Sequence, residues 1–199
     1  MNRLGIAFLA SNNGTSFRAV NEAIRANRID AAAVVLISNK ASSSALAYAE
    51  ANGIPSFHIP TKDREADAGK QLRDTLIDHG AELVVLSGYL RKLGPLSLEA
   101  FDRRILNVHP GLLPKYGGLG MYGRRVHQAV LENGETETGA TIHLVDGEYD
   151  HGGTVATATV QIDPLDDVLS LEQRVMAAEC DLFVDLIRRI ATGKLRLPL

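Results

Sequence analysis

The sequence contains a single cysteine, Cys180, among 199 residues. One cysteine cannot form an intrachain disulfide or a thiolate metal cluster, and this scarcity is typical of a reducing compartment. No apolar run approaches the roughly 20 residues that a membrane-spanning helix needs. The short apolar run near the N-terminus lacks a small-residue cleavage site, so it is interpreted as a buried strand and not as a signal peptide. We therefore expect a cytoplasmic protein without a membrane partner.

Neither the net charge nor any metal-ligand motif indicates a nucleic acid or a metal as a partner. The formal net charge is −3, so no overall field attracts the chain to nucleic acid. No H-x-x-x-H pair and no Cys/His set is present, and no metal is expected. The phosphate-binding Walker motif and the G-x-G-x-x-G dinucleotide fingerprint are also missing.

What the sequence does contain is an alternation of strand-length apolar runs with helical patterns. Apolar residues make up 45% of the chain, enough for one well-filled core. The pattern predicts strands at residues 4–10, 31–37, 56–59, 83–87 and 104–107, and helices at 15–26, 43–52 and 64–79. Repeated strand–helix–strand units favour a parallel sheet covered on both faces.

The pattern changes after about residue 135. Two β-rich runs, 138–145 and 154–162, flank the loop DGEYDHGG and predict an antiparallel pair, and a long helix at 169–192 follows. The predicted fold is α/β: a Rossmann-like, mostly parallel sheet flanked by helices, with a C-terminal antiparallel β-hairpin and a long final helix. We expect one domain, 1–199, with a phosphate-binding half at 1–103 and a catalytic and folate-binding half at 104–199.

The loop SNNGTSF joins the first predicted strand to the first predicted helix. Open α/β sheets bind ligands at the carboxyl ends of their strands, and a helix N-terminus offers free N–H groups to an anion. Gly14 permits close approach of the backbone, and Thr15 and Ser16 add hydroxyl donors. These residues could equally be ordinary turn and cap residues, so the loop alone leaves phosphate binding open.

A second motif, ILNVHPGLLPKYGG, places an amide and an imidazole at strand spacing. Asn107 and His109 therefore lie on one face of the strand and can both donate to an oxyanion. Asp150, in the late loop, is a candidate partner that would raise the pKa of His109. The alternative, a structural histidine and an ordinary loop aspartate, is about as well supported by spacing. His143 is interpreted as a core or cross-strand residue, and His127 as a packing residue in the helical pattern VHQAVLENG.

These motifs together resemble the phosphoribosylglycinamide formyltransferases, folate-dependent enzymes of de novo purine synthesis. The most specific match is NVHPGLLPKYGG, followed by DGEYDHGG, SNNGTS and SGYLRKLG, and the resemblance covers essentially the whole chain. It implies transfer of the formyl group of 10-formyltetrahydrofolate, a co-substrate, to the amine of 5′-phosphoribosylglycinamide. It implies small-molecule partners only, with the protein a monomer or homodimer.

The resemblance also implies a role for particular residues. The catalytic trio would be Asn107, His109 and Asp150, with the amide and a protonated imidazole stabilising the oxyanion. The ribonucleotide would contact Asn13, Gly14, Thr15, Ser16 and Glu179. The folate would contact Arg64, Leu86, Arg91, Lys92, Leu93, Leu98, Val145 and Asp146, and the loop at 145–150 would close over the pterin.

Some positions depart from the family pattern. Ser16 stands where an asparagine is common, and Met176 where a polar or basic residue is common, so two donors to the phosphate are missing. The stretch 119–127 is longer than in some members and is interpreted as a loop variant with solvated arginines. Alternatives are a related formyltransferase for another phosphorylated amine, a formyltetrahydrofolate hydrolase, and a non-catalytic folate-binding protein.

Overall fold

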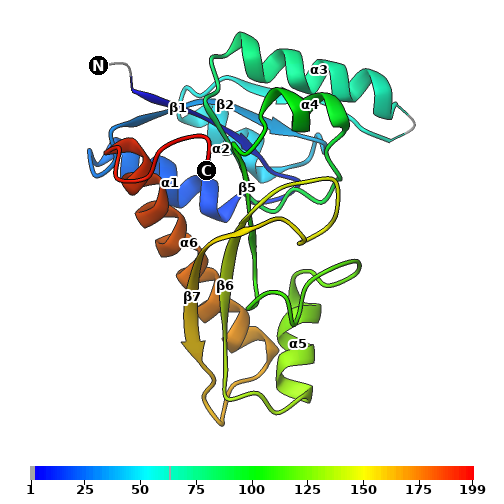
Figure 1. The fold of residues 1–199 in the computed structure, drawn as a ribbon, viewed down its shortest axis with the longest axis vertical. Coiled ribbons are helices and arrows are strands. Elements are labelled where there is room, and N and C mark those ends of the chain that lie inside the picture. Colours follow the sequence, from blue (N-terminus) through cyan, green and yellow to red (C-terminus); the bar gives the residue numbers. More distant parts are fainter. Residues whose placement is uncertain (1–2, 63) are drawn as a thin grey trace.

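Seven strands form a single sheet in the order β3-β2-β1-β4-β5-β6-β7 in the computed structural model, which describes residues 3–62 and 64–199 (Figure 1). The strands are β1 (Leu4–Leu9), β2 (Ala31–Ser38), β3 (Ser56–His58), β4 (Leu83–Leu86), β5 (Ile105–His109), β6 (Glu137–Leu144) and β7 (Thr154–Gln161). The first five are parallel, whereas β6 pairs antiparallel with both β5 and β7. The predicted mixed sheet is confirmed.

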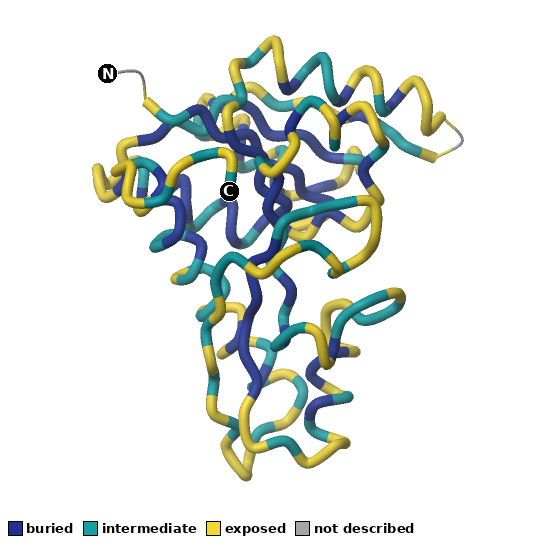
Figure 2. Tube along the Cα trace, in the orientation of Figure 1, coloured by how far each residue is buried: buried dark blue, intermediate teal, exposed yellow. Residues whose placement is uncertain are grey.

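Helices cover both faces of the parallel part of the sheet. Apolar side chains of α1 (Thr15–Arg25), α2 (Ser44–Ala51) and α6 (Val168–Ala191) pack against one face. Side chains of α3 (Glu65–Asp78) pack against the other, beside α4 (Pro95–Ala100). The strand runs are continuous apolar stretches because both of their faces are buried, and Figure 2 shows them as the dark centre of the molecule.

The second half of the chain extends away from this body. Figure 1 shows β6, β7, α5 (Arg124–Glu132) and the first turns of α6 forming a narrower lobe. A small separate core joins α5 to α6 there through Val126, Val130, Leu171 and Val175. The long α6 therefore belongs to both parts, and it begins with an Asp167 N-cap whose carboxylate accepts the N–H groups of Leu169 and Ser170.

Two short helices differ from the expectation. The sequence pattern assigned no helix to residues 95–100, but Pro95 is well placed at the first turn of α4 because its missing N–H is not needed there. The stretch 119–127 was interpreted as a loop that runs into a helical pattern at Val126, and the loop interpretation is wrong for residues 124 and 125, because α5 begins at Arg124. The glycine-rich residues before it concealed that start.

The strand order reverses between β1 and β4. The chain leaves the carboxyl ends of these two strands in different directions, and this divergence opens a crevice at that edge of the sheet. The end of β5 lies next to it. In the part of the chain that the structure describes, no helix is both long and apolar enough to cross a bilayer.

Candidate active site

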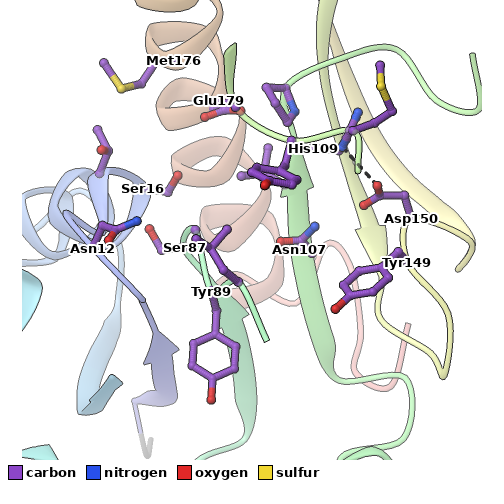
Figure 3. A pocket seen from close by; sticks show the side chains of 18 of the residues that line it. Asn12, Ser16, Ser87, Tyr89, Asn107, His109, Tyr149, Asp150, Met176 and Glu179 are labelled. Atoms are coloured by element: carbon purple, nitrogen blue, oxygen red, sulfur yellow. Dashed lines mark ion pairs between the residues drawn. The ribbon is translucent and has the colours of Figure 1, made fainter. Parts of the chain in front are cut away.

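A cavity of about 650 Å³ lies at the carboxyl edge of β1, β4 and β5. Its walls come from the β1–α1 loop, the ends of β4 and β5, the segment 118–123, the β6–β7 loop and one face of α6. Figure 3 shows Asn12 and Ser16 on one side of this space, His109 and Asp150 on the other, and Met176 and Glu179 on α6. The two sequence motifs therefore share one cavity.

The β1–α1 loop presents a row of unpaired backbone donors. Among the described residues, no group accepts the N–H of Asn13, Gly14, Thr15 or Ser16. Gly14 adopts a left-handed conformation with φ of 61°, and Ser16 is buried. Free N–H groups at the positive end of a helix favour an anion such as a phosphate.

His109 is held from two sides at the end of β5. Its Nε2 lies 2.6 Å from the Tyr116 carbonyl and donates to it, while its Nδ1 lies 3.4 Å from Oδ2 of Asp150. The side chain is buried. Both ring nitrogens thus face protein groups in this structure.

Asp150 lies between two histidines. Its Oδ1 is 3.4 Å from Nε2 of His143, and its Oδ2 accepts the Gly118 N–H at 3.0 Å. Asp150 itself has a left-handed backbone, with φ of 54°. Burial works to raise the pKa of Asp150, but the two imidazoles and the Gly118 N–H together hold this pKa below its ordinary value. The carboxyl is therefore ionised at neutral pH.

Asn107 also belongs to this cluster. Its Nδ2 is 3.1 Å from Nε2 of His143, whose Nδ1 is 2.8 Å from the Leu144 carbonyl. Nε2 of His143 faces both this amide and Oδ1 of Asp150, so it engages at most one amide hydrogen of Asn107. The second amide hydrogen remains for a ligand in the cavity.

The pKa of His109 differs from the expectation. Asp150 does act to raise the pKa of His109, but burial lowers this pKa more, and the net direction is below the ordinary value. The prediction of a raised pKa is therefore wrong for the free protein. The cause is the depth of the site, because removal from water disfavours the imidazolium more than one carboxylate at 3.4 Å favours it.

One face of α6 closes the cavity with Glu172, Met176 and Glu179. Burial, and to a lesser extent the charge of Glu172, raise the pKa of Glu179 to about 8. Glu172 is paired with Arg124 at 2.8 Å, so one of the arginines expected to be solvated forms an ion pair with a residue that lines the cavity. Met176 is 38% exposed and offers no hydrogen bond to a ligand.

A smaller cavity lies beside the main one and shares Tyr89, Asn107, Tyr149 and Asp150 with it. Six residues that the sequence assigned to folate line it: Leu86, Arg91, Lys92, Leu93, Val145 and Asp146. The other two lie elsewhere. Arg64 precedes α3, and Leu98 packs from α4 against the core, so neither lines either cavity.

The site also contains two buried histidines that were not expected there from the sequence. His143 was interpreted as a core or cross-strand residue, and it does pair with Asn107 across β5 and β6, but it also contacts Asp150. This contact depends on the pairing register of β5 and β6, which no local sequence pattern gives. His127 of α5 lines the main cavity, and its buried Nδ1 has no partner among the described residues.

Other reactive groups do not contribute. Cys180 is half-buried in α6, and burial raises the pKa of its thiol to about 11, so the thiolate is scarce at neutral pH. Within residues 3–62 and 64–199, no group of three or more His, Cys, Asp or Glu side chains is arranged to hold a metal ion. The chemistry of the cavity is that of an amide, imidazoles and carboxylates.

Comparison with known proteins decides the family. The family model described as "Formyl transferase" matches residues 4–187. The chain belongs to the formyl transferase family. A chloroplastic phosphoribosylglycinamide formyltransferase of Arabidopsis thaliana is 36% identical over 98% of this chain and 68% of its own length. The phosphoribosylglycinamide formyltransferase of Haemophilus influenzae is 34% identical over 96% of this formyl transferase and 89% of its own length.

Solved structures agree with this placement. A glycinamide ribonucleotide transformylase from Symbiobacterium toebii superimposes with a TM-score of 0.89 and 32% identity, over 98% of this chain and 91% of that one. The formyl transferase fold thus extends over the whole sheet and α6. It includes the β6–β7 pair, whose connecting loop carries Asp150.

Proposed function

We propose that this formyl transferase transfers the formyl group of 10-formyltetrahydrofolate to the amine of 5′-phosphoribosylglycinamide. The products are the formylated ribonucleotide and tetrahydrofolate, in de novo purine biosynthesis. The observation that carries the proposal is the placement of Asn107, His109 and Asp150 at one end of a cavity whose other end is the free N–H row of the β1–α1 loop. An amine and a phosphate of one acceptor can occupy these two ends together.

In this proposal the amine nitrogen attacks the formyl carbon, and the carbonyl oxygen becomes an oxyanion. Asn107 supplies a hydrogen bond to that oxygen through the amide hydrogen that His143 leaves free. His109 becomes a second donor once it is protonated. For this, its Nε2 must exchange the Tyr116 carbonyl for the substrate oxygen.

Proton transfer is assigned to Asp150 and His109. Because the pKa of His109 is lowered and Asp150 is ionised, the free site can accept the proton that the attacking amine releases. The imidazolium then returns a proton to the departing folate nitrogen as the bond between that nitrogen and the formyl carbon breaks. Asp150 stabilises the imidazolium through its 3.4 Å contact with Nδ1.

The acceptor is assigned to the main cavity and the folate to the smaller one. The phosphate would receive the N–H groups of the loop at Asn13, Gly14, Thr15 and Ser16, and Glu179 would contact the ribose. The pterin would lie among Leu86, Leu93 and Val145, below the loop at 145–150. The formyl group would lie between the two substrates, at the wall with Asn107 and Asp150 that the two cavities share.

We further propose that the chain works as one domain in the cytoplasm, as a monomer or homodimer, on small molecules alone. Residues 1–103 would bind the phosphate and contribute Leu86 and Leu93 to the folate site, and residues 104–199 would supply catalysis and the rest of the folate site. Size-exclusion chromatography with light scattering measures the oligomeric state directly.

The test of the activity is a spectrophotometric transfer assay. A 10-formylfolate analogue serves as donor and glycinamide ribonucleotide as acceptor, with a control that lacks acceptor and a panel of other amines. We expect turnover that depends on the ribonucleotide. Turnover without acceptor would indicate a hydrolase, and activity only with another amine would assign a different acceptor. Folate binding without any turnover would indicate a non-catalytic protein.

A further inference from the structure

Arg18, in the second turn of α1, folds back against the loop that precedes its own helix. Its Nε donates to the Asn13 carbonyl at 2.9 Å, and its Nη2 donates to the Ser44 carbonyl at 3.0 Å. The guanidinium lies 4.8 Å from the ring centroid of Tyr48. One side chain thus ties the β1–α1 loop to α2.

The bond to Asn13 determines where the next N–H group points. A peptide unit is planar and trans, so its C=O and N–H point in opposite directions. When Arg18 holds the Asn13 carbonyl, the Gly14 N–H of the same peptide unit must point away from Arg18. This N–H is one of the donors that has no partner among the described residues.

The flanking peptide units are fixed in the same way. The Asn12 carbonyl accepts from Ser43 Oγ at 2.6 Å and from Ala45 N at 3.1 Å. The Gly14 carbonyl accepts from the backbone N–H of Arg18 at 2.9 Å. Three successive carbonyls are therefore anchored to α1 and α2, which leaves three successive N–H groups on the opposite side of the loop.

Of these three anchors, the central one alone depends on a charged side chain.

The described residues that line the main cavity include no lysine or arginine. An acceptor phosphate therefore depends on the direction of the backbone N–H groups and on helix α1, without a cation in contact with it. Ser16 and Met176 do not offer the longer polar side chains that are common at these two positions in the family. Binding of the phosphate therefore depends more strongly on the geometry of the loop.

We propose that Arg18 is a positioning residue for acceptor specificity: it aims the Gly14 N–H at the acceptor phosphate by holding the Asn13 carbonyl, without touching the ligand. This inference rests on the proposed function, because that function supplies the phosphate. Lysine cannot replace arginine at this position, since one ammonium cannot reproduce the two diverging donors of the guanidinium.

The experiment compares two acceptors, glycinamide ribonucleotide and the same compound without its phosphate, in wild type, Arg18→Ala, Arg18→Lys and Arg25→Ala. Arg25 is the matched control, because it lies two turns further along α1 and bonds the Asn52 side chain at the far end of α2. It makes the same kind of contact between helices but does not reach the loop. Thermal unfolding of each variant reports the purely structural loss.

We expect Arg18→Ala to lower kcat/KM for the ribonucleotide about tenfold, mainly through KM, because one hydrogen bond to a charged group is misdirected. With the dephosphorylated acceptor, kcat/KM should equal that of wild type. Arg18→Lys should behave like Arg18→Ala, and Arg25→Ala like wild type on both acceptors.

Two results would overturn the inference alone: an Arg18→Ala enzyme that matches wild type on the ribonucleotide, or one that loses equally on both acceptors. Wild-type protein without turnover on the ribonucleotide would instead overturn the proposed function, and this inference with it. The wild-type measurement therefore separates the two failures.

Discussion

The carboxyl of Glu179 makes the stability of this protein depend on pH in a way that can be worked out from its surroundings. In the folded protein, burial and the neighbouring Glu172 raise the pKa of Glu179 from 4.5 to about 8. Above pH 4.5 the unfolded chain releases this proton while the folded chain retains it. The free energy of unfolding therefore falls as pH rises from 4.5 to about 8, and it levels off above that.

The size of this effect follows from the two pKa values. Their difference corresponds to about 5 kcal/mol above pH 8 and about 3 kcal/mol at pH 7. These are upper values, because the side chain of Glu179 is only half-buried and solvent therefore screens its charge. We therefore expect Glu179→Gln to raise the free energy of unfolding by about 2 kcal/mol at pH 7, and by nearly nothing at pH 4.5.

Urea unfolding of Glu179→Gln and wild type at pH 4.5, 6, 7 and 8 measures this difference. Asp181→Asn is the control, because Asp181 lies on the same helix but is exposed. It should change stability little at any of these values. A stability gain for Glu179→Gln that is equal at pH 4.5 and pH 8, or a loss at pH 7, would refute the reasoning. The same variant should also raise KM for the ribonucleotide, since the proposed ribose contact is weakened.

Three further predictions concern the chemistry and the sheet. Asn107→Ala should lower kcat about 100-fold or more, measured in the transfer assay, because an oxyanion donor is lost; a change below threefold would contradict the assigned role. The acid limb of kcat/KM should lie below pH 6.5, since the pKa of His109 is lowered, and Asp150→Asn should move the limb to still lower pH because the carboxylate that raises this pKa is gone; a limb that moves to higher pH would contradict this. Gly139→Ala should destabilise the protein by about 3 kcal/mol in urea, because a Cβ there would lie 1.9 Å from the Ala158 carbonyl oxygen; wild-type stability would show that β6 and β7 separate easily.

The sequence pattern was sufficient for the parallel sheet because its strands are apolar over their full length. Residues 83–87 are an example: the run LVVL is buried on both faces in β4, so no alternation was needed to recognise it. Short helices next to glycine were harder. The start of α5 follows Gly123, and the tight turns before it gave no helical period to detect.

Within the site, motif reading placed Asn107, His109 and Asp150 correctly in one cavity, because strand spacing and loop position determine direction. Two features were inaccessible to it. The direction in which the pKa of His109 shifts depends on burial, and no local sequence pattern reveals burial. The contact between His143 and Asp150 depends on how β6 aligns with β5, a long-range register.

The residues of α6 that line the cavity are separate from the residues of α6 that pack in the core. Its core-facing side chains, such as Leu171 and Val175, lie on a different stripe from Glu172, Met176 and Glu179, which face the cavity. Under the proposed function, substitutions on the cavity stripe would change which acceptor the site recognises without opening voids in the core. An engineer who wishes to accept bulkier or differently charged amines can vary these three positions as a library and leave the scaffold intact.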